Sequence, residues 1–284
     1  MPAGTLYVVA TPLGNLQDVT TRALTVLRSV ALVACEDTRR TRGLLAHFDI
    51  HPPRVISCHG FNERRQAETI LAALRGGDDV ALVSDGGTPS VSDPGAVVVD
   101  AALAEGLAVS PVPGPSAVAA AISVCGFLGT GFLFAGFLPP RAAARRRAVQ
   151  DLAQEARPIV LFEAPHRVAA AAADLHAGLG DRPVTVLREA TKIHEEVRRT
   201  TLESFARALS EGETPRGEFT LVIAGRPPAA RTRQADPTAE EAEALADRHQ
   251  RLLDSGMERR EALRHLMRET GLSRRQVYEA VRKR

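Results

Sequence analysis

Short apolar runs alternate with amphipathic stretches along most of this 284-residue chain. The apolar runs are rich in Val, Leu and Ala without polar interruption, which is typical of strands buried on both faces. The stretches between them repeat apolar residues at helical spacing. Alternation of this kind predicts a mainly parallel sheet that is covered by helices on both faces.

The first series of elements predicts an α/β domain over residues 1–115. The strands expected in it are Leu6–Ala10, Ala31–Cys35, Arg54–Cys58, Val80–Ser84 and Ala108–Val112. The helices expected between them are Thr21–Ser29, Thr38–Phe48, Asn62–Arg75 and Ala96–Ala104. Each predicted strand is followed by a helix, as in a parallel sheet.

A second series predicts another α/β domain over residues 116–226. Its expected helices are Ser116–Val124, Ala142–Gln154, Arg167–Ala177 and Ser204–Ser210. Its expected strands are Phe132–Phe137, Pro158–Phe162, Pro183–Arg188 and Glu218–Ala224. The predicted fold class is therefore α/β, with two such domains in succession.

The last part of the chain differs in composition. Residues 227–237 are rich in Pro, Ala and Arg and predict a linker. Residues 238–284 carry two capping-box patterns, Thr238 with Glu241 and Ser273 with Gln276, and predict a small helix-turn-helix-like domain. Its final twelve residues hold five basic and one acidic side chain, which favours contact with RNA phosphates. The alternative is a solvated three-helix cap or a dimerisation element.

The overall composition is that of a globular protein, with 44% hydrophobic and 25% charged residues. The sequence contains no apolar run long enough for a membrane span, and its first residues lack the basic start of a signal peptide. Three cysteines without a CxxC pair favour buried free thiols over disulfides or a metal site. These features predict a cytoplasmic protein without a bound metal.

Four common catalytic or nucleotide-binding patterns do not occur in the sequence. They are GxGxxG, GxxxxGK[ST], HExxH and GxSxG. Their absence argues against the usual dinucleotide enzymes, P-loop NTPases, zinc peptidases and serine hydrolases.

Five segments rich in Gly, Pro and polar residues begin at the carboxyl ends of predicted strands. They read TPLGNLQD, EDTRRT, SDGGTPSVSDPG, PVPGPSA and FEAPHR. Ligands of open α/β sheets bind outside those strand ends. The third segment, Ser84–Gly95, is longer than an ordinary strand-to-helix turn, so we expect it to form one wall of a ligand site.

Together with LYVVATPLGNLQDVTTRA, CEDTRRTRGLL, GFLPPR and TKIHEE, these segments resemble a known family. It is the family of small-subunit rRNA 2′-O-ribose methyltransferases that modify a cytidine of 16S rRNA, within the tetrapyrrole methylase superfamily. The resemblance implies two α/β domains with S-adenosylmethionine (SAM) bound in the cleft between them. It also implies a homodimer that acts on 16S rRNA or the small ribosomal subunit.

The resemblance and the chemistry of SAM together point to one set of cofactor-binding residues. Glycines allow close backbone approach, prolines stiffen the walls, and a carboxylate such as Asp85 suits the ammonium or sulfonium group. The expected residues are Pro12, Gly14, Asn15, Ser84, Asp85, Gly86, Gly87, Thr88, Pro89, Ser92, Asp93, Pro113, Gly114, Pro115, Ser116, Ala117, Phe162 and Glu163. For several of them the alternative is ordinary turn and capping chemistry.

Methyl transfer to a ribose hydroxyl benefits from a general base. The candidates are Asp85, Glu163, Glu189 and Lys192, and the sequence does not choose among them. Lys192 is one of only two lysines in the chain, and burial near cations would lower its pKa enough for it to act as a base. The alternatives are an ion pair between Glu189 and Lys192, and a role for Glu163 in orienting Arg167 or His166.

Clusters of arginine predict where RNA phosphates bind, and the alternative for each cluster is a solvated face. The residues expected to contact RNA are Arg39, Arg40, Arg141, Arg145, Arg146, Arg147, Arg274, Arg275 and Arg282. Two other functions stay open at this point. One is a SAM-dependent methylase of a tetrapyrrole precursor, and the other is a DNA-binding regulator that senses a small ligand.

Overall fold

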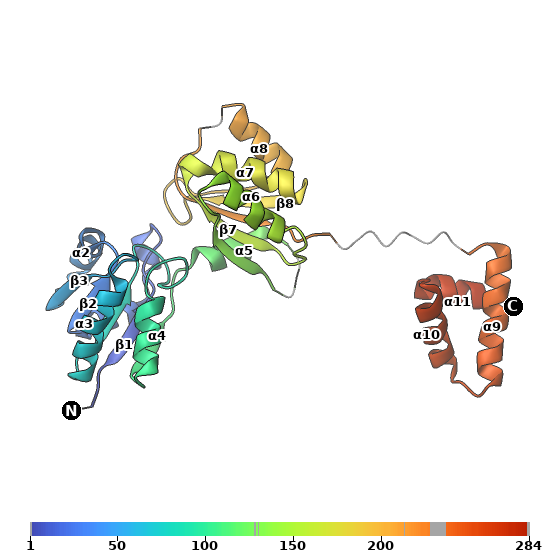
Figure 1. The fold of residues 1–284 in the computed structure, drawn as a ribbon, viewed down its shortest axis with the longest axis horizontal. Coiled ribbons are helices and arrows are strands. Elements are labelled where there is room, and N and C mark those ends of the chain that lie inside the picture. Colours follow the sequence, from blue (N-terminus) through green and yellow to red (C-terminus); the bar gives the residue numbers. More distant parts are fainter. Residues whose placement is uncertain (1, 128, 130, 213, 228–236, 283–284) are drawn as a thin grey trace. The chain divides into compact units, whose positions relative to one another are not determined.

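The computed structural model describes residues 2–127, 129, 131–212, 214–227 and 237–282. The chain divides into two compact units, Met1–Arg226 and Pro227–Arg284. The first unit contains two five-stranded sheets with their helices, and the second is helical (Figure 1). Of the predicted linker, residues 228–236 lie outside the described residues.

The first sheet is entirely parallel, as the alternating pattern predicts. Its strands are β1 (Thr5–Val9), β2 (Leu32–Cys35), β3 (Arg54–Ser57), β4 (Val80–Val83) and β5 (Ala108–Val112), in the order β3-β2-β4-β1-β5. Since all five strands run in one direction, the loops that follow them leave from a single edge. That edge is where the candidate site is built.

Helices cover both faces of the first sheet. They are α1 (Thr21–Ser29), α2 (Thr38–His47), α3 (Glu63–Arg75) and α4 (Ala96–Ala104). Leu6 and Leu82 pack with α3 and α4 on one face, whereas Val9 and Val83 pack with α1 and α2 on the other. Burial of such a side chain stabilises the fold by about 1.5–3 kcal/mol. We call these elements the first lobe.

The second sheet is mixed rather than mainly parallel. Its strands are β6 (Leu133–Phe137), β7 (Ile159–Glu163), β8 (Pro183–Arg188), β9 (Glu196–Thr201) and β10 (Phe219–Ile223), in the order β6-β7-β10-β8-β9. Only β6 and β7 are parallel, and β7, β10, β8 and β9 pair antiparallel in that order. The sequence did not predict β9, because this edge strand is polar and lacks an apolar run.

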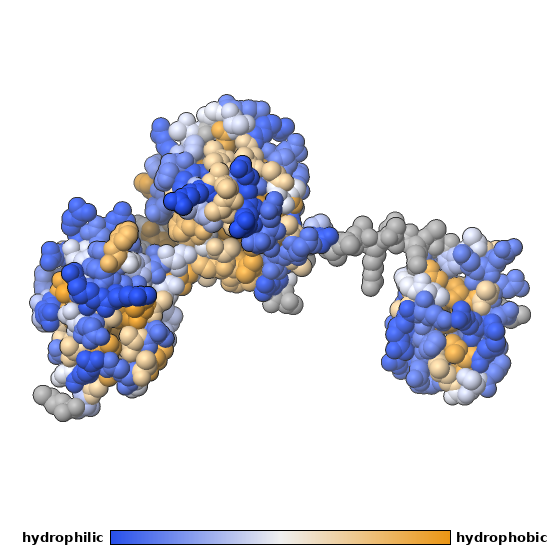
Figure 2. Space-filling model, viewed as in Figure 1, coloured by the Kyte–Doolittle hydropathy of each residue, from blue (hydrophilic) through white to orange (hydrophobic). Residues whose placement is uncertain are grey.

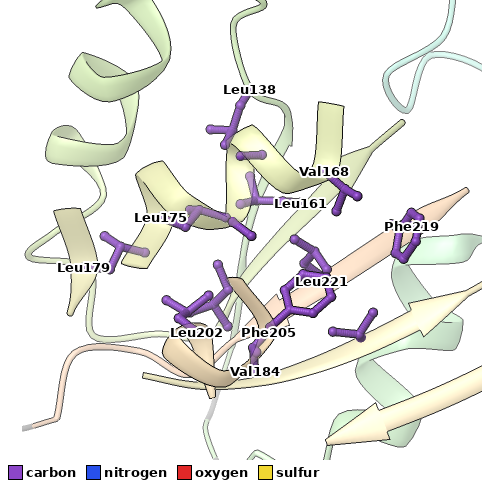
Figure 3. Packing of buried hydrophobic residues seen from close by; sticks show 14 of the residues in the cluster. Leu138, Leu161, Val168, Leu175, Leu179, Val184, Leu202, Phe205, Phe219 and Leu221 are labelled. Carbon is purple, nitrogen blue, oxygen red and sulfur yellow. The ribbon is translucent and has the colours of Figure 1, made fainter. Parts of the chain in front are cut away.

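The helices of the second sheet lie on both of its faces. They are α5 (Ala117–Cys125), α6 (Ala142–Asp151), α7 (Pro165–Leu179) and α8 (Leu202–Ser210). Leu175, Phe205 and Leu221 belong to the core shared with α6, α7 and α8 (Figure 3). Helix α5 packs on the opposite face through Val118 and Ala121. We call β6–β10 and α5–α8 the second lobe.

The second unit consists of α9 (Ala239–Asp254), α10 (Arg259–Thr270) and α11 (Arg274–Arg282). Leu245, Leu266 and Val277 form its small core. The capping box at Thr238 is present, and Ser273 and Gln276 exchange the bonds of a second one. Gly271 ends α10 with a φ of 69°, a conformation that favours glycine. The predicted helical region at the end of the chain is thus confirmed.

Candidate active site

Hydrogen bonds join four of the five predicted loops at the carboxyl edge of the first sheet. Thr11 and Gly87 exchange two backbone hydrogen bonds of 2.9 Å, which link the loops after β1 and β4. The Asp37 N–H donates to Asp85 Oδ1 at 3.0 Å, which adds the loop after β2. The Thr88 hydroxyl donates to the Pro115 carbonyl at 3.2 Å, which adds the loop after β5.

The long loop after β4, Ser84–Gly95, has an unusual backbone. Ser90 and Ser92 have φ values of 67° and 66°, in the left-handed region where residues other than glycine are strained. Buried Glu63 fixes the end of this loop, since its Oε1 accepts the Gly95 N–H at 2.7 Å and the Val97 N–H at 3.0 Å. A strained loop held in one shape is suited to a ligand wall.

Glycines keep the neighbouring loops in close contact. A Cβ atom at Gly114 would stand 3.0 Å from the Ala10 Cβ, and one at Gly86 would stand 3.3 Å from the Pro12 carbonyl oxygen. Internal packing therefore accounts for part of the glycine pattern. The side of each glycine on which a side chain would stand is occupied by the segment that follows β1.

The loop after β4 also touches the second lobe. Val91 belongs to a cluster with Phe134 and Phe162, and a Cβ atom at Gly136 would stand 2.9 Å from the Ser92 Oγ. This contact brings the fifth predicted loop, which begins at Phe162, into the same region. Two predicted cofactor residues, Ser92 of the first lobe and Phe162 of the second, therefore lie in the same region.

Glu163, at the end of β7, is buried and paired. Its Oε1 lies 3.2 Å from Arg167 Nε and accepts the Ala164 N–H at 2.9 Å. The sequence left two roles open for Glu163, a general base or a residue that orients Arg167 or His166. The contact between Glu163 and Arg167 matches the second role. The Arg167 guanidinium in turn donates to the Leu138 carbonyl.

A cluster of carboxylates lies at the centre of the site. Burial raises the pKa of Asp93 to about 6, helped by the charges of Glu36, Asp85 and Glu218 and opposed by a hydrogen bond with Ser84. Burial and the Asp85 charge also raise the pKa of Glu36. Neither Glu36 nor Glu218 was predicted, although each adjoins a strand at this rim. Such crowding of negative charge favours a bound cation.

Lys192 differs from the expectation drawn from its sequence. Its Nζ lies 2.8 Å from Glu189 Oε1 and 3.0 Å from Glu218 Oε2. Burial lowers the pKa of Lys192, but the two carboxylates outweigh that effect and the net pKa is raised. The hydrogen bond from Lys192 in turn lowers the pKa of Glu189. The predicted fall in the lysine pKa is wrong because both neighbours are anions.

A pocket of about 350 Å³ opens between the loop after β1, helix α2 and the end of β4. Four of the predicted cofactor residues line it: Pro12, Gly14, Ser84 and Asp85. The predicted segments Gly86–Pro89 and Pro113–Ala117 do not line it. The predicted set is therefore divided between this pocket and the neighbouring loops.

Two predicted residues have ordinary capping bonds. The Asn15 side chain accepts the Gln17 N–H at 3.0 Å, and the Ser116 hydroxyl accepts the Ala119 N–H at 3.4 Å. These bonds match the turn and capping alternative for both positions. Ala117 is the first residue of α5, directly after the Ser116 cap.

Arg145 is not placed to bind RNA. It is 8% exposed, and its Nε donates to Asp174 Oδ2 at 2.7 Å between α6 and α7. Helical spacing explains the difference, since residue 145 faces helix α7 while its neighbours in the same arginine cluster face outward. The other predicted arginines on the two lobes are exposed: Arg39, Arg40, Arg141, Arg146 and Arg147.

Basic side chains of the second unit are also exposed on its last helix. Arg274, Arg275 and Arg282 all lie at the surface of α11. Arg275 Nη1 is 3.7 Å from Glu279 Oε1, so one of the three is partly neutralised. Lys283 and Arg284 lie outside the described residues.

Within the described residues, no group of three or more His, Cys, Asp or Glu side chains is arranged to hold a metal ion. Cys35, Cys58 and Cys125 are buried free thiols, as predicted. No described helix combines the length and apolar character needed to cross a membrane.

Comparison with known proteins gives one family. The pattern of the tetrapyrrole (corrin/porphyrin) methylases matches residues 5–206. Those residues include both lobes up to helix α8 and all the predicted cofactor-binding positions.

Curated proteins of high similarity carry one name, ribosomal RNA small subunit methyltransferase I. The protein of that name from Synechocystis sp. is 46% identical over 97% of this chain and 96% of its own length. That from Micromonospora olivasterospora is 44% identical over 99% of this chain and 87% of its own. The Thermotoga maritima protein is 44% identical over 78% of this chain and 99% of its own length.

Solved structures share the fold at low sequence identity. A cobalt precorrin-4 methyltransferase of cobalamin biosynthesis aligns with a TM-score of 0.57 and 22% identity, over 77% of this chain and 94% of its own. A uroporphyrin-III C-methyltransferase from Thermus thermophilus, solved with S-adenosylhomocysteine, gives 0.56 and 21%, over 77% and 97%. At this identity the likeness concerns the fold alone.

Proposed function

Because the chain belongs to the tetrapyrrole (corrin/porphyrin) methylase family, we propose that it is a SAM-dependent methyltransferase that acts on the RNA of the small ribosomal subunit. The observation that carries this proposal is the 46% identity to the Synechocystis enzyme across 97% of the chain. That enzyme is named for small-subunit ribosomal RNA, and the similarity extends over both lobes and the second unit.

The residues at the rim fit SAM. The cofactor carries a sulfonium and an ammonium group, and Asp85, Asp93 and Glu36 provide crowded negative charge where such cations are favoured. We assign the cofactor to the loops after β4 and β5 and to the adjoining Phe162. When bound there, SAM supplies the electrophilic methyl group.

The chain's own task is to position the acceptor and remove its proton. A ribose hydroxyl is a weak nucleophile, and a base with a pKa near the working pH is the most effective. Among the carboxylates of the rim we assign this role to Asp93, since burial raises its pKa to about 6. In the proposed step the Asp93 carboxylate would take the hydroxyl proton as the ribose oxygen accepts the methyl group. The bond between the methyl carbon and the sulfonium sulfur would break, and S-adenosylhomocysteine would leave. Glu163 and Lys192 are held in ion pairs instead.

The finer proposal is that the acceptor is the 2′-hydroxyl of a cytidine in 16S rRNA. It rests on the resemblance of the rim segments to the 2′-O-ribose methyltransferases. The test is transfer of labelled methyl groups from SAM to small subunits, to naked 16S rRNA and to duplex DNA. Label in 2′-O-methylcytidine after nuclease digestion is the expected result. Label in a base, or specific duplex binding without transfer, would contradict the proposal.

We further propose that the protein is a cytoplasmic homodimer. The second lobe exposes apolar side chains that a partner copy would cover, and Figure 2 shows a mostly apolar surface over α5. Val124, Phe132 and Phe137 are 48%, 41% and 51% exposed. Light scattering during gel filtration should give twice the chain mass of 30.4 kDa. A particle of 30.4 kDa at micromolar concentration would contradict this assignment.

For the domains, we propose that residues 1–115 and 116–226 form the catalytic part and residues 238–284 an RNA-contact domain joined by 227–237. The Thermotoga maritima relative supports this division. Nearly its whole length corresponds to 223 residues of this chain, close to the length of Met1–Arg226. A protein of the same name is thus about as long as the first unit. The exposed arginines of α11 would then add affinity for RNA rather than chemistry.

A further inference from the structure

We propose that the pocket between the loop after β1 and helix α2 binds the acceptor nucleotide of the RNA, flipped out of its stack. This inference rests on the proposed function and adds to it a binding site for the substrate. The pocket volume of about 350 Å³ falls within the range of sites for small organic ligands, about 300–1,000 Å³.

The pocket adjoins the loops assigned to the cofactor, and of those loops only Ser84 and Asp85 line it. Strand β1 lies between β4 and β5 in the sheet, so the loop that follows β1 separates the pocket from the loop after β5. The two sites share a boundary at Asp85, which lines the pocket and directly precedes Gly86. A nucleotide in the pocket would therefore have the methyl donor as its neighbour.

Gly43 gives an independent indication that the pocket takes a ligand. It lies inside helix α2, where glycine is the least favourable residue after proline. A Cβ atom at position 43 would meet no described atom within 4 Å, so packing within the protein does not require glycine there. The residue lines the pocket, and its missing side chain keeps that wall open.

The lining matches the chemistry of a nucleotide. Leu13, Leu16 and Leu44 provide apolar surface for a base, and such sites combine apolar walls with a few polar groups. Arg40 is the expected phosphate ligand, because its side chain is 69% exposed and its Nη1, 3.3 Å from Asp85 Oδ2, places the guanidinium beside the pocket. The Asp85 carboxylate can accept hydrogen bonds from a ribose hydroxyl or the amino group of cytosine.

The test fills the pocket from the open side. Gly43→Leu places a side chain in it, Gly43→Ala adds only a methyl group, and Ala46→Leu changes an exposed position of the same helix that does not line the pocket. Both changes at residue 43 improve helix propensity, so they should fold. The measurements are the KM and Kd for unmethylated small subunits, and the Kd for SAM by calorimetry.

We expect Gly43→Leu to raise the KM and Kd for small subunits about tenfold or more, with a smaller effect for Gly43→Ala and none for Ala46→Leu. The Kd for SAM should stay within about twofold of the wild-type value. Unchanged binding of small subunits by Gly43→Leu, or an equal loss of SAM affinity, would overturn the inference. Wild-type protein that leaves the RNA unmethylated would instead refute the proposed function, whatever the variants bind.

Discussion

The side chain of Lys192 lies directly against the backbone of Gly14. A Cβ atom at residue 14 would stand 2.3 Å from Lys192 Cγ and 2.9 Å from its Cε. The contact joins the loop after β1 in the first lobe to the turn between β8 and β9 in the second. That turn is strained, with φ values of 51° at Glu189 and 62° at Thr191. The lysine therefore fixes one lobe against the other at the candidate site.

Gly14→Ala should destabilise the protein by about 1–3 kcal/mol, the usual effect of forcing an extra carbon into a packed contact. The second change Lys192→Ala removes the side chain that is in the way, so the double variant should be close to Lys192→Ala alone. Thermal melting of the four proteins in the cycle gives the coupling between the two positions. Additive shifts would show that the two residues do not touch.

Lys192→Ala should reduce methyl transfer less than about tenfold and leave the shape of its pH–rate profile unchanged. The pKa of Lys192 is raised by its contacts with Glu189 and Glu218, so the amine is protonated at neutral pH and does not serve as a base. Removal of a true general base costs about 10²–10⁴-fold in rate. The kcat measured from pH 6 to 9 decides whether Lys192 is the general base or only an ion-pair residue. Loss of the basic or acidic limb of the pH–rate profile would restore Lys192 as the base.

Asp93→Asn should lower kcat by about 10²-fold or more if this carboxylate takes the ribose proton. The same change should make the protein more stable at pH 8. The pKa of Asp93 is raised from 3.8 to about 6, so folding disfavours its ionised form. This destabilisation is present above pH 6 and disappears as the pH falls toward 3.8. It amounts to about 3 kcal/mol at most, since each pKa unit corresponds to 1.36 kcal/mol.

The stability of Asp93→Asn is therefore measured relative to wild type as a function of pH. A melting temperature that rises at pH 8 and converges with wild type near pH 4 is the expected pattern. An Asp93→Glu variant serves as a control for charge. Reduced stability at pH 8 would mean that the Asp93 carboxylate is needed for folding rather than held for chemistry.

Arg145 and Arg146 offer a matched pair. Arg145→Ala leaves the partly buried Asp174 without its partner and should cost about 3 kcal/mol in the free energy of unfolding. Arg146→Ala removes an exposed charge and should leave stability unchanged while weakening RNA binding. Chemical denaturation and filter binding separate the two effects. Equal stability of both variants would contradict the burial of Arg145.

Much of the fold follows from patterns of a few neighbouring residues. Buried strands such as Val80–Val83 have no polar residue, and a parallel order places the loops after them at one edge. The region of the ligand site was predictable for that reason. The capping box at Thr238 was predictable as well, since its two hydrogen bonds are local.

Features that depend on distant residues were not predictable. Strand β9 is polar and is a strand because it pairs with β8 along its whole length. The ion pairs of Lys192 reach Glu218, 26 residues away, and those of Arg145 reach Asp174, 29 residues away. No local pattern carries such a contact, so the raised pKa of Lys192 and the burial of Arg145 became evident only in the structure.

Truncation after Arg226 should weaken RNA binding while leaving SAM binding intact. The first unit has cores of its own in both lobes, so it should fold without the second unit. Arg274, Arg275 and Arg282 leave with the removed segment, and each lost phosphate contact should reduce the slope of log K against log salt by about 0.7–0.9. The Kd for small subunits at several salt concentrations, and the Kd for SAM, test this.

A full-length variant with the three arginines changed to glutamine is the matched control and should reproduce the lower slope. Equal RNA affinity of the truncated and full-length proteins would remove the second unit from substrate binding and leave a solvated cap or a dimerisation element as its remaining assignments.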